Sequence, residues 1–156
     1  MRRLVALRVG TLALAALLLP PATRVAHADP LDARHIVRLT NESRQKAGLP
    51  PVTIDEKLMA AAKAKLFDML KQDYFAHRTP DGRQPWAFMQ AAGYRFQVAA
   101  ENLAKGYDNE PDLQRAWMKS RGHRANILNP LFTEIGVADA NGVVVVLFGR
   151  PAPPKR

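Results

Sequence analysis

Three side chains in this sequence are the best suited to chemistry: His77, Glu101 and His123. His77 and His123 each follow the expected end of a helix, where the backbone can direct a side chain into a cleft. Glu101 falls in a segment with strand character, where a carboxylate is costly unless it is paired, hydrogen-bonded or bound to a cation. Two imidazoles and one carboxylate form a suitable ligand set for a divalent metal, and zinc suits these ligand types.

Other interpretations of these three residues stay open. The two histidines could instead form a proton-shuttling pair, one neutral and one charged. The three positions are separated by 24 and 22 residues, so no local spacing code, such as His-Glu-x-x-His, brings them together. They could also be unrelated polar residues, with His77 and His123 serving as turn and cap groups.

The remaining candidate groups favour structural roles. His35 lies in an expected helix with no partner nearby, which is typical of a surface or half-buried histidine. Trp86, Phe88 and Met89 are interpreted as core residues rather than as a shelf for a ligand. No serine, threonine or cysteine nucleophile is evident beside a base, and this favours binding over catalysis.

Caps and apolar periodicity predict the first two helices. Asp29-Pro30 predicts an N-cap followed by proline at the first helical position, with the helix ending at Ala47, before Gly48. The stretch Thr53-Ile54-Asp55-Glu56 is a capping-box pattern for the second helix. That helix should end near Asp73. Its predicted buried face is made of apolar residues three and four apart: Leu58, Ala62, Leu66, Met69 and Leu70.

The middle of the chain predicts shorter elements. The residues Thr-Pro-Asp-Gly at 79–82 favour a turn, and a short helix over 86–92 should close at Gly93. Residues 94–104 have the pattern of a strand, which would contain Glu101. The next helix should follow Asn109-Glu110-Pro111 and break at Gly122, one residue before His123.

The end of the chain predicts a β-hairpin. Asn141-Gly142 separates apolar runs over 135–140 and 143–148, and this dipeptide favours a tight turn in which both central residues have positive φ. Helices come first and the hairpin last, which predicts an α+β domain with helices packed on a small antiparallel sheet. The tail, residues 150–156, is rich in proline and basic residues and should be frayed.

Residues 1–28 have the features of a signal peptide. Arg2 and Arg3 give a cationic start, residues 12–19 are an unbroken apolar run, and Ala26-His27-Ala28 is a small-x-small cleavage pattern. The run is shorter than the roughly 20 apolar residues that span a bilayer. We therefore expect a secreted or extracytoplasmic protein, in the periplasm or the cell envelope, with no transmembrane span after cleavage at residue 28.

Composition limits the remaining possibilities. The 156 residues allow one domain beside the signal segment, over 29–149. The absence of cysteine excludes disulfides, thiolate metal sites and cysteine nucleophiles. The net charge of +9 falls to +5 without the four arginines of residues 1–28. The basic residues are scattered, which argues against a nucleic-acid partner, and we expect a monomer.

Six blocks of residues, in this order, resemble the CAP superfamily. This family, also called the SCP domain, comprises the cysteine-rich secretory proteins, antigen 5 and pathogenesis-related protein 1. The chain is most similar to the short, cysteine-free bacterial branch, over residues 36–149. The blocks are Asn41-x-x-Arg44-x-x-x-Gly48-Leu49, Tyr74-Phe75-Ala76-His77-x-x-Pro80-x-Gly82, Gly93-Tyr94, Glu101-Asn102-Leu103-Ala104, Trp117-Met118-x-Ser120-x-Gly122-His123-Arg124-x-Asn126-Ile127-Leu128, and Phe132-Thr133-Glu134-Ile135-Gly136-Val137.

The resemblance implies an α-β-α sandwich with a large open cleft. In the family, two histidines and two acids line this cleft and bind a divalent cation in some members. The first histidine matches His77, the first acid Glu101 and the second histidine His123. The second acid has no clear match, because Trp117 is followed by Met-Lys-Ser. The implied metal or ligand site therefore has three residues, with water or Ser120 completing it.

Three functions are compatible with this resemblance, since one fold can carry several activities. The first is a non-catalytic binding module whose cleft holds a divalent metal or a small ligand. The second is a metal-assisted hydrolase acting on peptide or envelope material, with Glu134 or Ser120 as an accessory group. The third is capture of a lipid or sterol in a separate apolar groove. The expected partner is thus a small ligand, a lipid or an envelope component.

Overall fold

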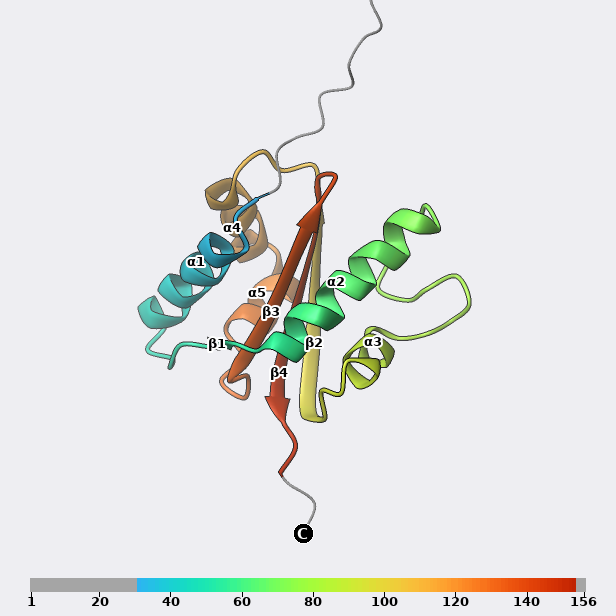
Figure 1. The fold of residues 1–156 in the computed structure, drawn as a ribbon. Coiled ribbons are helices and arrows are strands. Elements are labelled where there is room, and N and C mark those ends of the chain that lie inside the picture. The colour runs from blue at the N-terminus through green and yellow to red at the C-terminus, as the bar shows by residue number, and fades with distance from the viewer. Residues whose placement is uncertain (1–30, 154–156) are drawn as a thin grey trace, which may run out of the picture.

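The computed structural model describes residues 31–153, and the expected signal segment lies outside them. Within this range, helices cover both faces of one sheet, so the expected α-β-α sandwich is confirmed (Figure 1). In chain order the elements are α1 (Ala33–Lys46), β1 (Thr53–Ile54), α2 (Glu56–Lys71), α3 (Pro85–Ala91), β2 (Phe96–Lys105), α4 (Glu110–Lys119), α5 (Arg121–Ile127), β3 (Glu134–Ala140) and β4 (Val143–Pro151).

The sheet has the strand order β1-β3-β4-β2 and is mixed rather than purely antiparallel. β4 pairs antiparallel with both β3 and β2, whereas the two residues of β1 pair parallel with β3. The predicted hairpin is confirmed, with φ of 51° at Asn141 and 70° at Gly142. β2, which carries Glu101, is therefore an edge strand of this sheet.

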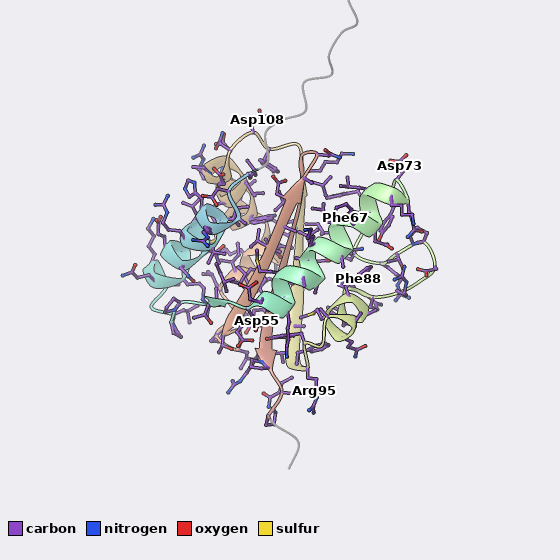
Figure 2. All side chains as sticks on the ribbon, in the orientation of Figure 1. Asp55, Phe67, Asp73, Phe88, Arg95 and Asp108 are labelled. Atoms are coloured by element: carbon purple, nitrogen blue, oxygen red, sulfur yellow. The ribbon has the colours of Figure 1, made fainter. Side chains whose placement is uncertain are left out.

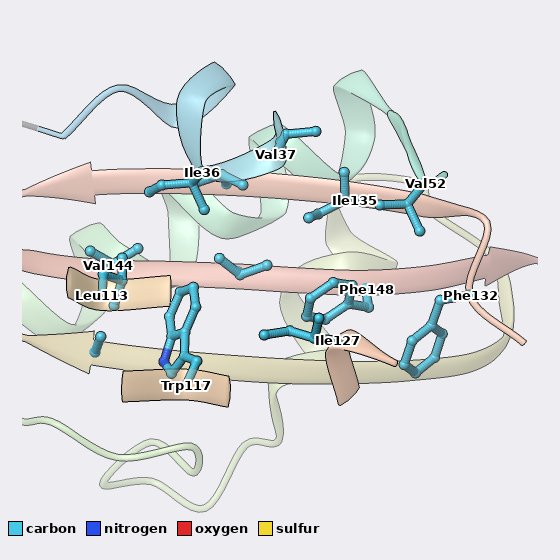
Figure 3. Packing of buried hydrophobic residues seen from close by; sticks show 13 residues of the cluster. Ile36, Val37, Val52, Leu113, Trp117, Ile127, Phe132, Ile135, Val144 and Phe148 are labelled. Carbon is cyan, nitrogen blue, oxygen red and sulfur yellow. The ribbon is translucent and has the colours of Figure 1, made fainter. Parts of the chain in front are cut away.

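The central strand β4 contributes to two hydrophobic cores. Val144, Val146 and Phe148 face the core under α1, α4 and α5, which also holds Ile36 and Trp117 (Figure 3). The intervening residues of β4 face a second core under α2 and α3: Val143, Val145 and Leu147. Because successive strand residues point to opposite faces, a strand buried on both sides must be apolar throughout.

Glycine at one position lets α2 lie very close to the sheet. A Cβ atom on Gly136 of β3 would be 2.1 Å from the carbonyl carbon of Leu58 in α2. α2 crosses one face of the sheet over β3 (Figure 1). The short separation between α2 and β3 is thus possible because Gly136 has no side chain.

The starts of the first two helices differ from the prediction. α1 begins at Ala33, with Asp32 as the N-cap, because the Asp32 carboxylate accepts a hydrogen bond of 2.8 Å from the Arg34 amide. The predicted cap, residues 29 and 30, lies outside the described range. The predicted end of α1 is confirmed, since Ala47 is the C-cap and Gly48 has φ of 72°.

For α2, the N-cap is Asp55 (Figure 2), which accepts hydrogen bonds of 2.9 Å from the amides of Lys57 and Leu58. The capping-box interpretation with Thr53 was wrong. The Thr53 amide instead donates to the carbonyl of Thr133, as part of β1. The predicted buried face of α2 is confirmed, with Leu70 only half-buried.

The helix break before His123 was also misplaced. The chain leaves helical geometry at Ser120, which has ψ of 123°, and a new helix, α5, contains both Gly122 and His123. His123 therefore lies within a helix rather than after one. The predicted end of the short helix is confirmed, since α3 closes at Gly93, which has φ of 75°.

The start of the expected frayed tail is ordered. β4 continues to Pro151, with Arg150 opposite Val98 and Pro151 opposite Phe96 of β2. The tail prediction was wrong for these residues, because β2 is long enough to pair with them. Residues 154–156 lie outside the described range.

Candidate functional site

A direct contact joins two of the three predicted site residues. His77 Nδ1 lies 2.7 Å from Glu101 Oε1, a hydrogen-bonding distance, although the residues are 24 positions apart. The Glu101 side chain is 2% exposed, whereas that of His77 is 61% exposed. The imidazole thus covers a buried carboxyl group at the protein surface.

A buried lysine positions the loop that carries His77. Lys65 lies on the apolar face of α2 and is fully buried. Its Nζ atom donates to the carbonyl oxygen of Ala76 at 2.8 Å and to the Tyr74 hydroxyl at 3.0 Å. These contacts fix the backbone directly before His77. Lys65 is also near enough to Glu101 for each charge to favour the ionised form of the other.

The same loop is tied back to α2 by a second set of polar contacts. The Tyr74 hydroxyl donates to Asp68 Oδ2 at 2.6 Å, and the Arg83 guanidinium lies 3.1 Å from Asp68 Oδ1. Burial and the hydrogen bond to Asp68 raise the pKa of Tyr74. The predicted turn closes the loop through a 2.9 Å bond from the Gly82 amide to the Thr79 carbonyl.

His123 lies on α5, on the other face of the sheet, and its ring centroid is 6.2 Å from that of Trp117. Glu101 and Asn102 are consecutive in β2, so their side chains point to opposite faces. Asn102 Nδ2 donates to the His123 carbonyl at 3.2 Å, and Asn126 Nδ2 donates to Asn102 Oδ1 at 2.8 Å. These amides attach α5 to the edge strand. The main chain of His123 is therefore held on the face of β2 opposite to Glu101.

Arg44 fixes the segment that follows α5. Its guanidinium is fully buried and donates to four backbone carbonyls, at 2.9 Å to Pro50, Ile127 and Asn129 and at 3.1 Å to Phe132. Burial lowers the pKa of Arg44. Every carbonyl that faces this charge is thereby satisfied, and α1 holds the end of the helix that carries His123.

The electrostatics of the site follow from burial. Burial raises the pKa of Glu101, and the hydrogen bond from His77 opposes this shift. Burial, followed by the nearby charge of His77, lowers the pKa of His123. The second carboxyl oxygen of Glu101, Oε2, is buried and has no hydrogen-bond partner within residues 31–153. A buried polar atom of this kind calls for a partner from outside the chain.

A cavity of about 330 Å³ opens beside this carboxyl group. Besides His77 and Glu101, its lining includes Gln84, Trp86 and Asn126. The sequence interpretation placed Trp86 with Phe88 and Met89 in the core; the latter two are buried, but Trp86 is 37% exposed and lines the cavity. Trp86 was missed because a helix of only seven residues is too short for its periodicity to separate an exposed position from the buried Pro85, Phe88 and Met89.

Lys65 was also missed, although the sequence contains a signal for it. It lies seven residues after Leu58 and three after Ala62, which places it on the apolar stripe of α2. A lysine there must find hydrogen-bond acceptors inside the protein. Asn126 and Gln84 gave no such signal, because their roles depend on contacts between distant elements.

The accessory groups named from the sequence lie elsewhere. Ser120 is at the junction of α4 and α5 and makes no capping hydrogen bond with its side chain. Glu134 accepts a 2.6 Å hydrogen bond from the Tyr94 hydroxyl and lines a different cavity. His35 has a partner after all, since its Nδ1 lies 3.3 Å from Glu110 Oε2 of α4.

The donor types at this site suit zinc. Within residues 31–153, however, no group of three or more His, Asp or Glu side chains is placed to hold a metal ion together. Nδ1 of His77 is engaged by Glu101, which is the usual role of a carboxylate that orients a metal-binding histidine. The predicted metal site of His77, Glu101 and His123 therefore stays a prediction.

Comparison with known proteins establishes the family. Residues 37–144 match the model of the cysteine-rich secretory protein family, CAP, so the chain belongs to this family. It is 47% identical over 104 residues to YkwD of Bacillus subtilis (strain 168), covering 67% of this chain and 40% of YkwD. The membrane protein YlbC of the same strain is 32% identical over 104 residues, covering 67% of this chain and 30% of YlbC. The chain thus spans less than half the length of these relatives.

Solved structures agree with the fold. An extracellular SCP-domain protein from Bacillus anthracis str. Ames has a TM-score of 0.72 and 31% identity, covering 75% of this chain and 39% of that chain. An outer surface protein from Borrelia burgdorferi has a TM-score of 0.69 and 22% identity, covering 80% of this chain and 99% of that chain. At this lower identity the likeness shows the fold alone. None of the helices within residues 31–153 has the length and apolar character to span a membrane.

Proposed function

We propose that this protein is an exported, non-catalytic binding module whose cleft, formed by His77, Glu101 and His123, holds a divalent cation or the polar group of a small ligand. One observation carries the proposal. The Glu101 carboxyl group is buried, His77 occupies one of its oxygens, and the other has no partner within the described residues. A ligand that supplies this partner gains a hydrogen bond in a site shielded from water.

The surroundings of Glu101 favour binding over turnover. The residues that line its cavity include amides, an imidazole and an indole, and Glu101 is the one acid among them. A nucleophile activated by an adjacent base is not among these lining residues. Export is supported by the signal-peptide pattern of residues 1–28 and by the relation to an extracellular SCP-domain protein.

Zinc is the most direct probe of this cleft. Bound zinc would polarise a ligand or water group, and the neutral imidazoles of His77 and His123 would hold it. Isothermal titration of the purified protein with Zn²⁺ at pH about 7.5 should show one site. Substitution His77→Ala or His123→Ala should weaken binding at least tenfold, or about 1.4 kcal/mol.

The matched control is His35→Ala. His35 is half-buried like His123, but it pairs with Glu110 on α4, away from the cleft. Its loss should leave the zinc affinity unchanged. Equal titrations for the wild-type protein and all three variants would contradict a zinc site at this cleft. If the protein cleaved casein or cell-wall fragments, and if a chelator and Glu101→Gln each abolished the cleavage, the hydrolytic function would replace the binding function.

A specific cavity favours lipid capture as a second candidate function. A groove of about 550 Å³ lies between α1, α4 and α5. Apolar surface comes from Leu39, Pro111, Met118 and Leu128. Three cationic side chains, Lys46, Arg115 and Arg124, outnumber the one carboxylate, Glu42. This combination suits an acyl chain that carries an anionic group.

Mass spectrometry of solvent extracts from the purified protein tests this second function. A co-purifying lipid should be lost in Met118→Lys, which places a charge in the apolar part of the groove. Glu101→Gln should leave it in place, because Glu101 belongs to the other cavity. Lipid retention by Met118→Lys would contradict binding in this groove.

A further inference from the structure

The cavity beside Glu101 has two kinds of surface. One is apolar and includes Trp86, an indole that remains 37% exposed in the first turn of α3. The other is polar and comes from Gln84 before α3, Glu101 on β2 and Asn126 on α5. A ligand that fills this cavity must present a flat apolar face and several hydrogen-bonding groups.

The polar groups retain unused hydrogen-bonding capacity. Gln84 occupies the N-cap position of α3, but its side chain makes no capping hydrogen bond. Asn126 uses its amide nitrogen for the Glu101 carbonyl, at 3.3 Å, and for Asn102 Oδ1, at 2.8 Å. Its side-chain oxygen is not used in either bond. Glu101 Oε2 is buried without a partner in the part of the chain that the structure describes.

The mixture of amides with a single carboxyl group favours hydroxyl and acetamido partners over an organic cation. Amides both donate and accept, as sugar hydroxyls do, whereas a site for an organic cation relies on fixed negative charge around the aromatic ring. The volume of about 330 Å³ is near the lower end of the range for small-molecule sites, which suits a single ring.

We propose that the cavity binds a pyranose sugar of an extracytoplasmic glycan, with the ring stacked on Trp86 and its polar substituents bonded to Glu101, Gln84 and Asn126. This inference rests on the proposed binding function of the cleft and names the class of its ligand. The apolar face of the pyranose covers the indole. The ring hydroxyls exchange hydrogen bonds with the amide side chains of Gln84 and Asn126.

The experiment uses triacetylchitotriose and cellotriose as glycan probes. Binding of either one is measured by isothermal titration and by tryptophan fluorescence, since Trp86 is exposed and Trp117 is buried. Trp86→Ala should lower the affinity by roughly tenfold or more, and Trp86→Phe by less, because phenylalanine keeps an aromatic face. Circular dichroism and the melting temperature establish that both variants fold.

Phe67→Ala is the matched control. Phe67 is an exposed aromatic on α2, 61% accessible, and it lines a different groove (Figure 2). Its loss should leave glycan affinity unchanged. Failure of both sugars to bind, binding that is unaffected by Trp86→Ala, or binding of choline in their place would overturn the proposal.

A zinc titration of Trp86→Ala separates this inference from the proposed function. Trp86 supplies no metal donor, so zinc affinity should equal that of the wild-type protein. Zinc binding without glycan binding would overturn the sugar proposal and leave the binding cleft supported. The absence of both would remove the two proposals together.

Discussion

The ammonium group of Lys65 donates a 2.8 Å hydrogen bond to the backbone carbonyl of Ala76, the residue directly before His77. Lys65 is fully buried on α2, so this bond joins the hydrophobic core to the loop of the candidate site. The position of His77 at the surface is thus set from inside the protein. The loop is ordered because the buried ammonium group of Lys65 would be left without hydrogen-bond acceptors if the loop moved away.

Replacement of this lysine should uncouple the loop from the core. We expect Lys65→Met to lower the free energy of unfolding by about 1–3 kcal/mol, because the Ala76 carbonyl and the Tyr74 hydroxyl each lose a buried partner. Lys63→Met, at an exposed position of the same helix, should change it by less than about 0.5 kcal/mol. Urea unfolding gives both values. Equal stability of the two variants would mean that the Lys65 contacts contribute nothing.

The pH dependence of stability should carry a contribution from His123. Burial lowers its pKa below the unfolded value of about 6.5, so the folded protein binds the proton less well than the unfolded chain. The stability contribution of neutral His123 is therefore fully present above pH about 6.5 and is lost as the pH falls through its folded pKa. In His123→Gln this part of the pH dependence should disappear. An NMR titration midpoint of the His123 ring at or above about 6.5 would contradict the expected direction.

Two glycines should respond to alanine in opposite ways. Gly136→Ala should cost at least about 1–3 kcal/mol, because the new Cβ would lie 2.1–2.5 Å from backbone atoms of α2. Gly122→Ala should stabilise the protein by about 0.4–1 kcal/mol, since Gly122 lies within α5 and a Cβ there meets nothing within 4 Å. Thermal unfolding of the two variants compares them directly. Stabilisation by Gly136→Ala would show that α2 can move away from the sheet at little cost.

Arg44 should be among the side chains on which stability depends most. Arg44→Met would remove the side-chain donor from four backbone carbonyls, two of them in buried bonds, at Ile127 and Phe132, and we expect a loss of at least about 3 kcal/mol. Arg44→Lys should recover little of it, because an ammonium group lacks the planar fork that reaches several acceptors. Arg38→Met, at an exposed site paired with Glu42 on the same helix, should cost under about 1 kcal/mol. A small effect of Arg44→Met in chemical denaturation would contradict this role.

Local patterns predicted much of the fold. The Asn141-Gly142 turn, the buried face of α2 and the end of α1 at Gly48 all follow from the residues at those positions. The start of α2 could not be read in this way, since Thr53 is drawn into β1 by pairing with a segment 80 residues away. The break at Ser120 likewise reflects how α5 attaches to β2 through Asn102.

The site was predictable only in part for the same reason. His77 and Glu101 meet because a loop and an edge strand fold together, and no spacing rule encodes that meeting. Residue type and the resemblance to the family both indicated these two residues, whereas Trp86 and Lys65 are not in the blocks that match the family. Trp86 is recognised by its exposure, which belongs to the tertiary structure, whereas the burial of Lys65 also follows from its place on the apolar stripe of α2.

The length of the hairpin turn at Asn141-Gly142 also determines which core each side chain of β4 faces. Val143, Val145 and Leu147 fill one half of the molecule, while Val144, Val146 and Phe148 fill the other. One residue inserted into the turn would shift the register of β4 by one residue. Each set of side chains would then point to the opposite face of the sheet, so both cores would be mispacked. The chain should therefore tolerate length changes in its outer loops far better than a single added residue at this corner.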